Sequence, residues 1–409
     1  MTRVVITGMA VCCSTGQNLQ QFLQSLKLGR SGKAPIPVAR FDTSSPIYRN
    51  RSGATLPYEE IEKLSRSDDT ILTEFAISVV QAALLDAGLD VQTIYAKPTD
   101  VGICIGTTVG ATYSFIKFMK GKLNLPNGDI NTVLKPCTTG TIAGSIAKYF
   151  RVQGPISVIS TACASGTNSV GRAFDLIRKN KVKRMIAGGV DLFSELTFSG
   201  FNSLQAVSKD ACRPFDEDRD GLMLGDAAAI LILENIEEAY AREARIYGEV
   251  CGYAIANEAF HATGPDPQGL WAFSVMKGAL DQGSLTPAEV NYINAHGTGT
   301  KANDSMELAA IRLLLGPRMK DVYVSSTKSM VGHTLGAAGS VELVATVLGM
   351  FYDFIPPTIN LCRPIKGFEE VNFVRDHALP GKILIALSNS FGFGGNVASI
   401  AVRNKDLLA

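Results

Sequence analysis

Short apolar runs alternate along this chain with segments whose apolar residues recur every three or four positions. The short runs have the length of buried strands, and the periodic segments have the spacing of one helix face. We expect strands at residues 4–6, 101–105, 156–160, 185–187, 228–233, 290–293, 322–325, 383–386 and 398–402. Helical periodicity is clear in residues 71–82, 170–177 and 341–348. The alternation indicates an α/β protein with buried sheets and helices outside them.

The composition narrows the class of protein. The 409 residues carry 39 Lys and Arg against 38 Asp and Glu, and a net charge of +1 excludes a generally basic nucleic-acid-binding protein. No run reaches the ~18 apolar residues of a membrane span. Thr7 and Gly8 interrupt the first apolar stretch, so we expect a first strand there and not a signal peptide. We therefore expect a cytoplasmic protein that binds neither membrane nor nucleic acid.

Cysteine and histidine spacing argues against a metal site. The eight cysteines form no C-x-x-C pair, and several lie in apolar runs, which is typical of reduced cysteine in a reducing compartment. The four histidines show no zinc-type spacing. The glycine-rich segments complete neither a G-x-G-x-x-G fingerprint nor a P-loop. We predict no metal and no nucleotide cofactor.

The first polar motif contains a cysteine at a strand-to-helix turn. Residues 160–166 read S-T-A-C-A-S-G, between an expected strand and an expected helix. Free backbone N–H groups and the helix dipole favour a thiolate at Cys163, as a thioester-forming nucleophile requires. The alternative is a small buried cysteine, and for a lone cysteine that alternative is the more common.

Two further motifs contain histidines just beyond expected strands. Residues 294–300 read N-A-H-G-T-G-T, which places His296 in a glycine-rich turn, although a hydrogen-bonded histidine in a turn is the plain alternative. Residues 325–333 read S-S-T-K-S-M-V-G-H and contain Lys328 and His333. Glu342 follows on a helical segment and could pair with Lys328, since a buried lysine without a partner is costly.

The fourth motif is a glycine-rich loop near the C-terminus. Residues 388–395 read S-N-S-F-G-F-G-G, and the glycines let backbone N–H groups point into a pocket, as in an oxyanion hole. All four motifs lie at the C-terminal ends of expected strands, where sites in open α/β sheets collect. Their coincidence favours one shared active site.

The four motifs resemble those of the elongating β-ketoacyl-acyl carrier protein synthases, most of all the synthase II type. The similarity runs nearly end to end and keeps order and spacing. It implies a thiolase-like five-layer αβαβα fold made of two similar halves. Residues 1–250 would carry the cysteine and residues 251–409 the two histidines. It also implies a dimer that performs a decarboxylative Claisen condensation and extends an acyl chain by two carbons.

The resemblance implies a role for each catalytic residue. Cys163 would accept the acyl chain, and its N–H and that of Phe393 would hold the oxyanion. His296 and His333, as neutral imidazoles, would bind the malonyl thioester oxygen and stabilise the enolate. Lys328 would orient the histidines. Glu342, which would hold Lys328, has a supporting role.

The resemblance also implies where the substrate binds. Thr298 and Thr300 would hydrogen-bond the pantetheine arm, which arrives on the acyl carrier protein, so the enzyme needs no cofactor of its own. Phe393 matches a gating phenylalanine at the acyl pocket. Val109 matches a position that limits chain length, and its small side chain suggests a roomy pocket.

Other residues concern the protein partners. In the family that the chain resembles, a helix with several basic residues often docks the acidic carrier protein, and the resemblance implies this role for Lys63 and Arg66. Gln205 stands where an arginine is frequent in that family. Residues 299–304 and 330–333 also resemble ketosynthase subunits of type II polyketide and polyene systems. Homodimer and heterodimer with a chain-length-factor partner therefore both stay open, as does the choice between fatty-acid and polyketide or aryl-polyene synthesis. A non-catalytic partner subunit and a hydrolase are further alternatives.

Overall fold

The computed structural model describes residues 2–64, 70–121, 134 and 137–408. All nine expected strands and all three expected helices are present, and their bounds follow. The strands are β1 Val4–Cys13, β2 Ala34–Pro35, β3 Ser52–Gly53, β4 Val101–Gly106, β5 Ile156–Ile159, β6 Arg184–Asp191, β7 Ala227–Asn235, β8 Gly248–Asn257, β9 Tyr292–Asn294, β10 Tyr323–Ser325, β11 Phe354–Ile355, β12 Asn372–Phe373, β13 Leu379–Pro380, β14 Ile385–Gly392 and β15 Asn396–Asn404. The helices are α1 Leu19–Leu28, α2 Tyr58–Glu62, α3 Ile71–Asp86, α4 Val91–Ala96, α5 Thr112–Met119, α7 Thr141–Phe150, α8 Ser165–Arg178, α9 Glu195–Ser203, α10 Ile236–Ala241, α11 Leu270–Gln282, α12 Lys301–Leu315, α13 Lys328–Val331 and α14 Ala338–Phe351.

The strand order shows that the chain repeats one topology. The main sheet runs β12-β10-β9-β14-β15-β8-β1-β7-β6-β4-β5. The first set consists of β1, β4, β5, β6 and β7. From the outer edge of the sheet inwards these strands lie in the order β5, β4, β6, β7, β1, which is third, second, fourth, fifth and first along the chain. The set β8, β9, β10, β14 and β15 has the same order, and in both sets the last two pairings are antiparallel. The two sets join where the first residues of β1 pair with β8. The expected two similar halves are therefore present.

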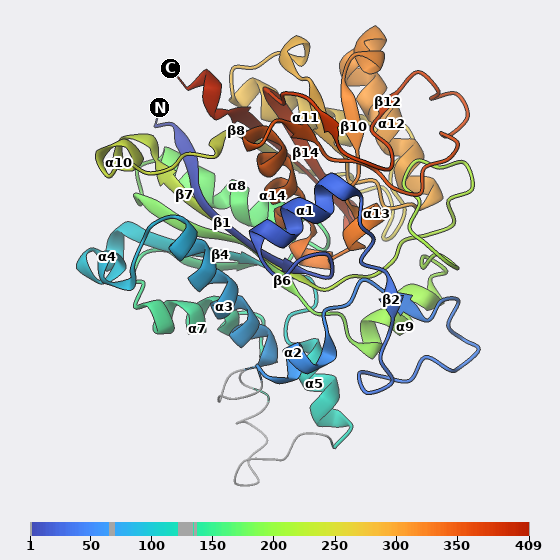
Figure 1. Cartoon of the computed structure of the whole chain (residues 1–409), viewed down its shortest axis with the longest axis horizontal. Helices are drawn as coiled ribbons and strands as arrows, with labels where there is room; N and C mark the ends of the chain where they lie inside the picture. The colour runs from blue at the N-terminus through green and yellow to red at the C-terminus, as the bar shows by residue number, and fades with distance from the viewer. Residues whose placement is uncertain (1, 65–69, 122–133, 135–136, 409) are drawn as a thin grey trace.

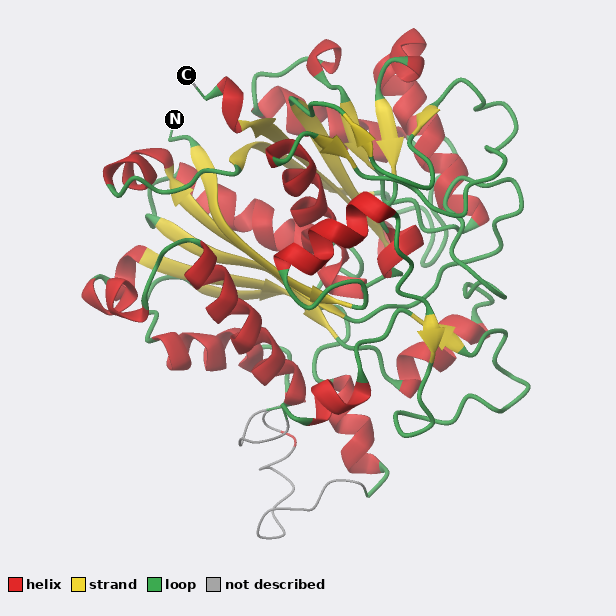
Figure 2. Ribbon diagram, viewed as in Figure 1, coloured by secondary structure: helices red, strands yellow, loops and turns green. Residues whose placement is uncertain are grey.

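Helices complete five layers around these two sets of strands. In Figures 1 and 2, α3 and α7 cover the outer face of the first set, and α11 and α12 cover that of the second. The central layer consists of α8 and α14, which pack against each other and against both sets of strands. The αβαβα arrangement expected from the sequence is thus confirmed. Within the described residues, no helix is long and apolar enough to span a membrane.

The first strand of the second half was missed by the hydrophobic pattern. β8 contains Gly248, Glu249 and Gly252, which interrupt its apolar residues and weaken the strand signal. Its pairing with β1 and β15 makes it a strand all the same. The boundary expected between residues 250 and 251 falls within β8, and it stays a prediction.

Small residues let the two central helices approach closely. A Cβ atom at residue 166 of α8 would lie 2.7 Å from the carbonyl oxygen of Gly336, and one at residue 339 of α14 would lie 1.9 Å from Thr167 Oγ1. Neither contact is sterically possible, so glycine is required at both positions. The close approach brings the start of α8, next to the cysteine motif, against the segment that follows the lysine–histidine motif.

Candidate active site

Cys163 lies in a strained turn between β5 and α8. Ala162, the residue before it, has φ = 50°, which is uncommon for a residue with a side chain. Thr108 Oγ1 donates a hydrogen bond of 2.8 Å to the carbonyl oxygen of Ala162 and holds this turn. Cys163 itself is only 6 % exposed. The turn therefore presents the sulfur to an enclosed space at the start of a helix.

Burial controls the protonation of this cysteine. It raises the pKa of Cys163 to about 12, although the positive charge of Lys328 acts in the opposite direction. The resting form at neutral pH is therefore the thiol. Burial thus opposes the thiolate that the helix start was expected to favour, and that expectation stays a prediction.

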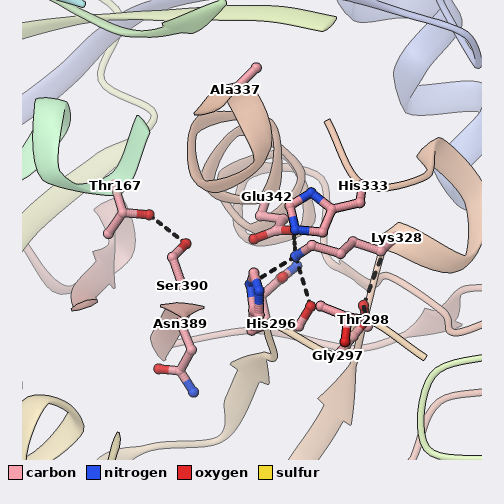
Figure 3. A network of polar contacts seen from close by, with 12 residues as sticks. Thr167, His296, Gly297, Thr298, Lys328, His333, Ala337, Glu342, Asn389 and Ser390 are labelled. Atoms are coloured by element: carbon pink, nitrogen blue, oxygen red, sulfur yellow. Dashed lines mark hydrogen bonds and ion pairs between the residues drawn. The ribbon is translucent and has the colours of Figure 1, made fainter. Parts of the chain in front are cut away.

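Lys328 determines the tautomer of His296. Its Nζ lies 3.1 Å from His296 Nδ1, donates to the His296 carbonyl oxygen at 2.7 Å, and bonds Glu342 Oε1. An ammonium can only donate, so Nδ1 of His296 accepts and the ring proton is on Nε2. Figure 3 shows how His296, His333, Lys328 and Glu342 converge. All three hydrogens of the ammonium are used within this cluster.

His333 is held in the same tautomer by a different donor. The backbone N–H of Leu335 donates to His333 Nδ1 at 3.0 Å, which again leaves the proton on Nε2. The two rings are 5.5 Å apart between centroids and nearly perpendicular. Burial, helped by the charge of Lys328, holds the pKa of both rings well below the ordinary value. The site therefore offers two neutral imidazoles, each with an Nε2–H to donate.

Glu342 compensates the buried charge of Lys328. Both side chains are almost completely buried, at 1 % and 0 % exposed. Burial raises the pKa of Glu342 to about 7, and the attraction of Lys328 opposes this increase. The pair forms as the sequence suggested, between α13 and α14.

Two acidic residues on α12 hold the histidine turn, and sequence reasoning did not single them out. Glu307 accepts the backbone N–H groups of His296 and Gly297, each at 2.8 Å. Asp304 accepts those of Thr298 and Gly299 at 3.0 and 3.2 Å. The signal was available, because two carboxylates three residues apart lie on one helix face directly after the turn.

The glycine-rich loop lies against the cysteine, as expected for an oxyanion hole. A Cβ atom at residue 392, the last of β14, would lie 2.9 Å from the backbone nitrogen of Cys163. Phe393 follows directly, and its ring stacks on Phe201 of α9 with centroids 5.8 Å apart. The structure thus brings the backbone of residues 392–393 and the N–H of Cys163 together.

Most of the expected residues line one cavity of about 580 Å³. The members of the expected set that line it are Cys163, His296, His333, Thr298, Thr300 and Phe393. The Thr298 and Thr300 hydroxyls lie 2.8 Å apart in its wall. The basic side chains of Arg49, Lys209 and Lys301 also line the cavity, and sequence reasoning missed them because they belong to three separate segments.

Two of the residues expected to bind the substrate or the carrier protein lie elsewhere. Val109 does not line this cavity and packs instead against a cluster that includes Phe193 and Leu335, so a roomy acyl pocket beside it stays a prediction. Lys63 also lies outside the cavity, on the surface next to α2, where it pairs with Glu60 at 2.6 Å. Arg66 lies outside the described residues.

Comparisons with known proteins agree with this geometry. The chain matches the models of the β-ketoacyl synthase N-terminal domain over residues 1–239 and C-terminal domain over residues 247–362. It is 38% identical to the 3-oxoacyl-[acyl-carrier-protein] synthase 2 of Synechocystis sp., over 98% of both chains. The chain belongs to the β-ketoacyl synthase family. It is therefore a ketosynthase, an enzyme of the acyltransferase class.

Two further similarities concern polyketide systems. The chain is 34% identical to a putative polyketide β-ketoacyl synthase 1 of Streptomyces cyaneus, over 96% of both chains. Among solved structures, it superimposes on the ishigamide ketosynthase/chain length factor with a TM-score of 0.90 and 32% identity, over 98% of this chain and 99% of that one. A type II polyketide acyl-carrier protein in complex with its ketosynthase gives a TM-score of 0.87 at 29% identity, over 98% and 99% of the chains.

The site has no evident place for a metal ion. Among the described residues, no three His, Cys, Asp or Glu side chains are grouped so that they could hold one. The polar groups that line the cavity include hydroxyls, imidazoles, Lys and Arg side chains, the amides of Gln205 and Asn303, and the carboxylates of Asp220 and Glu258. The absence of a cofactor stays a prediction from the sequence.

Proposed function

We propose that this chain condenses an acyl group held on Cys163 with malonyl-acyl carrier protein. The acyl thioester first transfers to the sulfur of Cys163, and the thiol proton ends on the departing carrier thiol. Malonyl carrier protein then loses carbon dioxide, and its enolate attacks the acyl-cysteine. The product is a β-ketoacyl chain two carbons longer, and the cysteine is released for the next cycle.

The tautomers of the two histidines carry this proposal. Nε2–H of His296 and Nε2–H of His333 are both free to donate to one thioester oxygen. That oxygen becomes negative as the carboxylate leaves, so the two hydrogen bonds strengthen in the transition state. A general base would need an unprotonated nitrogen in the same place, and both Nδ1 atoms are already engaged as acceptors. The arrangement suits enolate stabilisation better than hydrolysis.

The backbone N–H groups of Cys163 and Phe393 serve the other half of the cycle. We assign them to the oxyanion of the tetrahedral intermediates in acyl transfer and condensation. We assign the hydroxyls of Thr298 and Thr300 to the pantetheine arm, which brings the substrate to the cavity on the carrier protein. Lys63, Arg66 and the basic side chains of the cavity lining would attract the acidic carrier, mainly by raising the association rate.

Intact-mass analysis of the purified chain tests this function. We expect an acyl adduct on Cys163 after incubation with acyl carrier protein, and a product longer by two carbons after addition of malonyl carrier protein. The Cys163→Ala variant is the control and should give no adduct. An adduct on another residue would overturn the assignment of the nucleophile, and hydrolysis of the adduct without elongation would favour a hydrolase.

A second candidate is the same chemistry as one subunit of a type II polyketide or aryl-polyene synthase. The similarity to a ketosynthase/chain length factor favours this candidate. The chain would then act as a heterodimer with a partner that lacks the active cysteine, and otherwise as a homodimer, in the cytoplasm in either case. Elongation by the chain alone supports the first candidate. Elongation only after a chain-length-factor-like subunit is added supports the second.

A further inference from the structure

One buried carboxylate connects the two halves of the site without lining the cavity. Asp191 ends β6 and is completely buried. Its Oδ1 accepts from Thr107 Oγ1 at 2.5 Å and from the Val109 N–H at 3.2 Å. Its Oδ2 accepts from the Thr108 N–H at 2.7 Å and from the Gly336 N–H at 2.6 Å. These four donors belong to a loop after β4 in the first half and to a turn before α14 in the second.

The donors in residues 107–109 connect Asp191 to the nucleophile, Cys163. The loop of residues 107–109, held by Asp191, places Thr108 so that its hydroxyl bonds the carbonyl oxygen of Ala162. Ala162 is the residue with positive φ that directly precedes Cys163. A strained turn persists only where its surroundings hold it. Asp191 therefore supports the turn that presents the sulfur, through a single intervening residue.

The remaining donor, the N–H of Gly336, connects Asp191 to His333. The N–H of Gly336 is bound by Asp191, and the preceding N–H, that of Leu335, fixes the tautomer of His333. Leu335 itself has φ = 54°, so this turn is also strained. A Cβ atom at residue 336 would lie 2.5 Å from the nitrogen of Thr108 and 2.7 Å from Asp191 Oδ2. The two loops therefore meet in direct contact at the carboxylate, with no room for a side chain.

We propose that Asp191 is a positioning residue that aligns the nucleophile and His333 with each other. The inference deepens the proposed function and rests on it, since the alignment concerns the same thioester. Cys163 belongs to the first half of the fold and His333 to the second, and one rigid acceptor holds the loops that carry both. An error of about 1 Å between reacting groups costs about 100-fold in rate.

Three variants and one control test the proposal. Asp191→Ala removes all four acceptor contacts, and Asp191→Glu keeps a carboxylate. Thr108→Val, at a half-buried position, removes only the contact to Ala162. The control is Glu234→Ala. Glu234 of β7 is another completely buried carboxylate. It pairs with Arg184, which lies at the opposite end of β6 from Asp191.

The readouts are steady-state condensation and the ring signals of the enzyme labelled with 15N-histidine. The chain has only four histidines, so the signals can be assigned by single substitutions. In Asp191→Ala we expect kcat to fall about 100-fold with little change in KM, and the His333 ring to leave the pure Nε2–H form. Asp191→Glu should recover most of kcat. Thr108→Val should slow acylation of Cys163 while the His333 signals stay as in the wild type.

The outcomes separate this proposal from a merely structural role and from failure of the proposed function. Wild-type kcat or an unchanged His333 tautomer in folded Asp191→Ala would overturn the proposal, as would an equal loss of kcat in Glu234→Ala. If Asp191→Ala does not fold, Thr108→Val and Asp191→Glu decide. In Thr108→Val, acylation of Cys163 at the wild-type rate would refute the connection from Asp191 to the nucleophile. Loss of the Nε2–H form of His333 in the same variant would refute the view that the connections to Cys163 and His333 are separate. A wild-type enzyme that gives no condensation product, either alone or with a chain-length-factor-like subunit, would refute the proposed function, and the ring signals would still test Asp191.

Discussion

Lys328 Nζ lies 3.1 Å from Nδ1 of His296 and so decides which nitrogen of that ring can face a substrate. The same ammonium bonds the His296 carbonyl oxygen and Glu342, and its three hydrogens are thereby all used. A lysine with no free hydrogen and no lone pair is a poor base and a poor substrate ligand. We therefore expect Lys328 to orient His296 and to keep both imidazoles neutral.

This relationship separates the stability of the cluster from its activity. Lys328→Met leaves Glu342 as an unpaired buried carboxylate, and we expect a loss of ~3–5 kcal/mol in the free energy of unfolding. The double variant Lys328→Met/Glu342→Leu replaces the pair by apolar groups and should recover most of that loss. Neither variant should decarboxylate malonyl carrier protein at more than a small fraction of the wild-type rate, because the tautomer of His296 is no longer fixed.

Urea titration and a carbon dioxide release assay measure the two effects on the same samples. Wild-type decarboxylation in the stable double variant would contradict the orienting role of Lys328. Failure of the second substitution to restore stability would contradict the view that the unpaired carboxylate causes the loss.

The protonated state of Cys163 leads to a second prediction. With its pKa raised to about 12 by burial, the rate of alkylation by iodoacetamide should keep increasing with pH up to at least pH 10. A small thiol such as glutathione is the control and should level off near pH 9, close to the ordinary thiol value of ~8.5. The rate is followed by mass spectrometry of the Cys163 peptide after short pulses. A plateau of the protein rate below pH 8 would show that the helix start prevails over burial.

The sequence allowed the fold class and the site to be predicted because both depend on local patterns. Three of the four motifs begin at or just after the end of a strand, and the fourth runs from the second part of β14 into the turn after it. Parallel pairing brings such strand ends together within each half. Cys163, His296, Lys328 and His333 could therefore be assigned to one site before their distances were known.

What the sequence did not show depends on contacts between distant segments. Asp191 receives its donors from residues 107–109 and 336, and no local pattern links these positions. The topological repeat was expected only from the family resemblance, because β8 lacks a regular apolar pattern that would reveal it. The opposing effect of burial on the expected thiolate at Cys163 was missed for a related reason, since the sequence reveals a helix start but not how far neighbouring loops exclude water.

The neutral histidines predict a pH dependence of stability. Because the folded-state pKa of His333 is lowered, the unfolded chain binds its proton first as the pH falls below ~6.5. The contribution of His333 to stability is therefore present above pH 6.5 and is lost on acidification, by ~1.4 kcal/mol per pH unit. Glu307 and Glu342, whose folded-state pKa values are raised to about 7, act with the opposite sign. The effect must therefore be measured as a difference between variants.

The comparison is between the wild type and His333→Asn, unfolded in urea at pH 7, 6 and 5. We expect the wild type to lose stability relative to the variant as the pH falls. His377→Asn, at an exposed position, is the matched control for the substitution itself. A constant difference between wild type and His333→Asn, or the same slope for His377→Asn, would be inconsistent with a buried neutral ring at His333.

The contact between Gly392 and Cys163 provides the sharpest test of the oxyanion hole. A Cβ atom at residue 392 would lie 2.9 Å from the nitrogen of Cys163, so Gly392→Ala must push the loop away from the cysteine. The N–H of Phe393 moves with that loop. Removal of one oxyanion donor costs about 100- to 1,000-fold in kcat, and we expect a loss of this size in acyl transfer to Cys163.

The matched control is Gly144→Ala in α7, where a Cβ atom would meet nothing within 4 Å. Because alanine is the better helix former, this variant should be as active as the wild type and more stable by ~0.5–1 kcal/mol. Rapid-quench measurement of the acyl-enzyme compares the two glycine variants directly. If Gly392→Ala acylates at the wild-type rate, the backbone of residues 392–393 does not contribute to the oxyanion hole, and a donor other than Phe393 must be sought around Cys163.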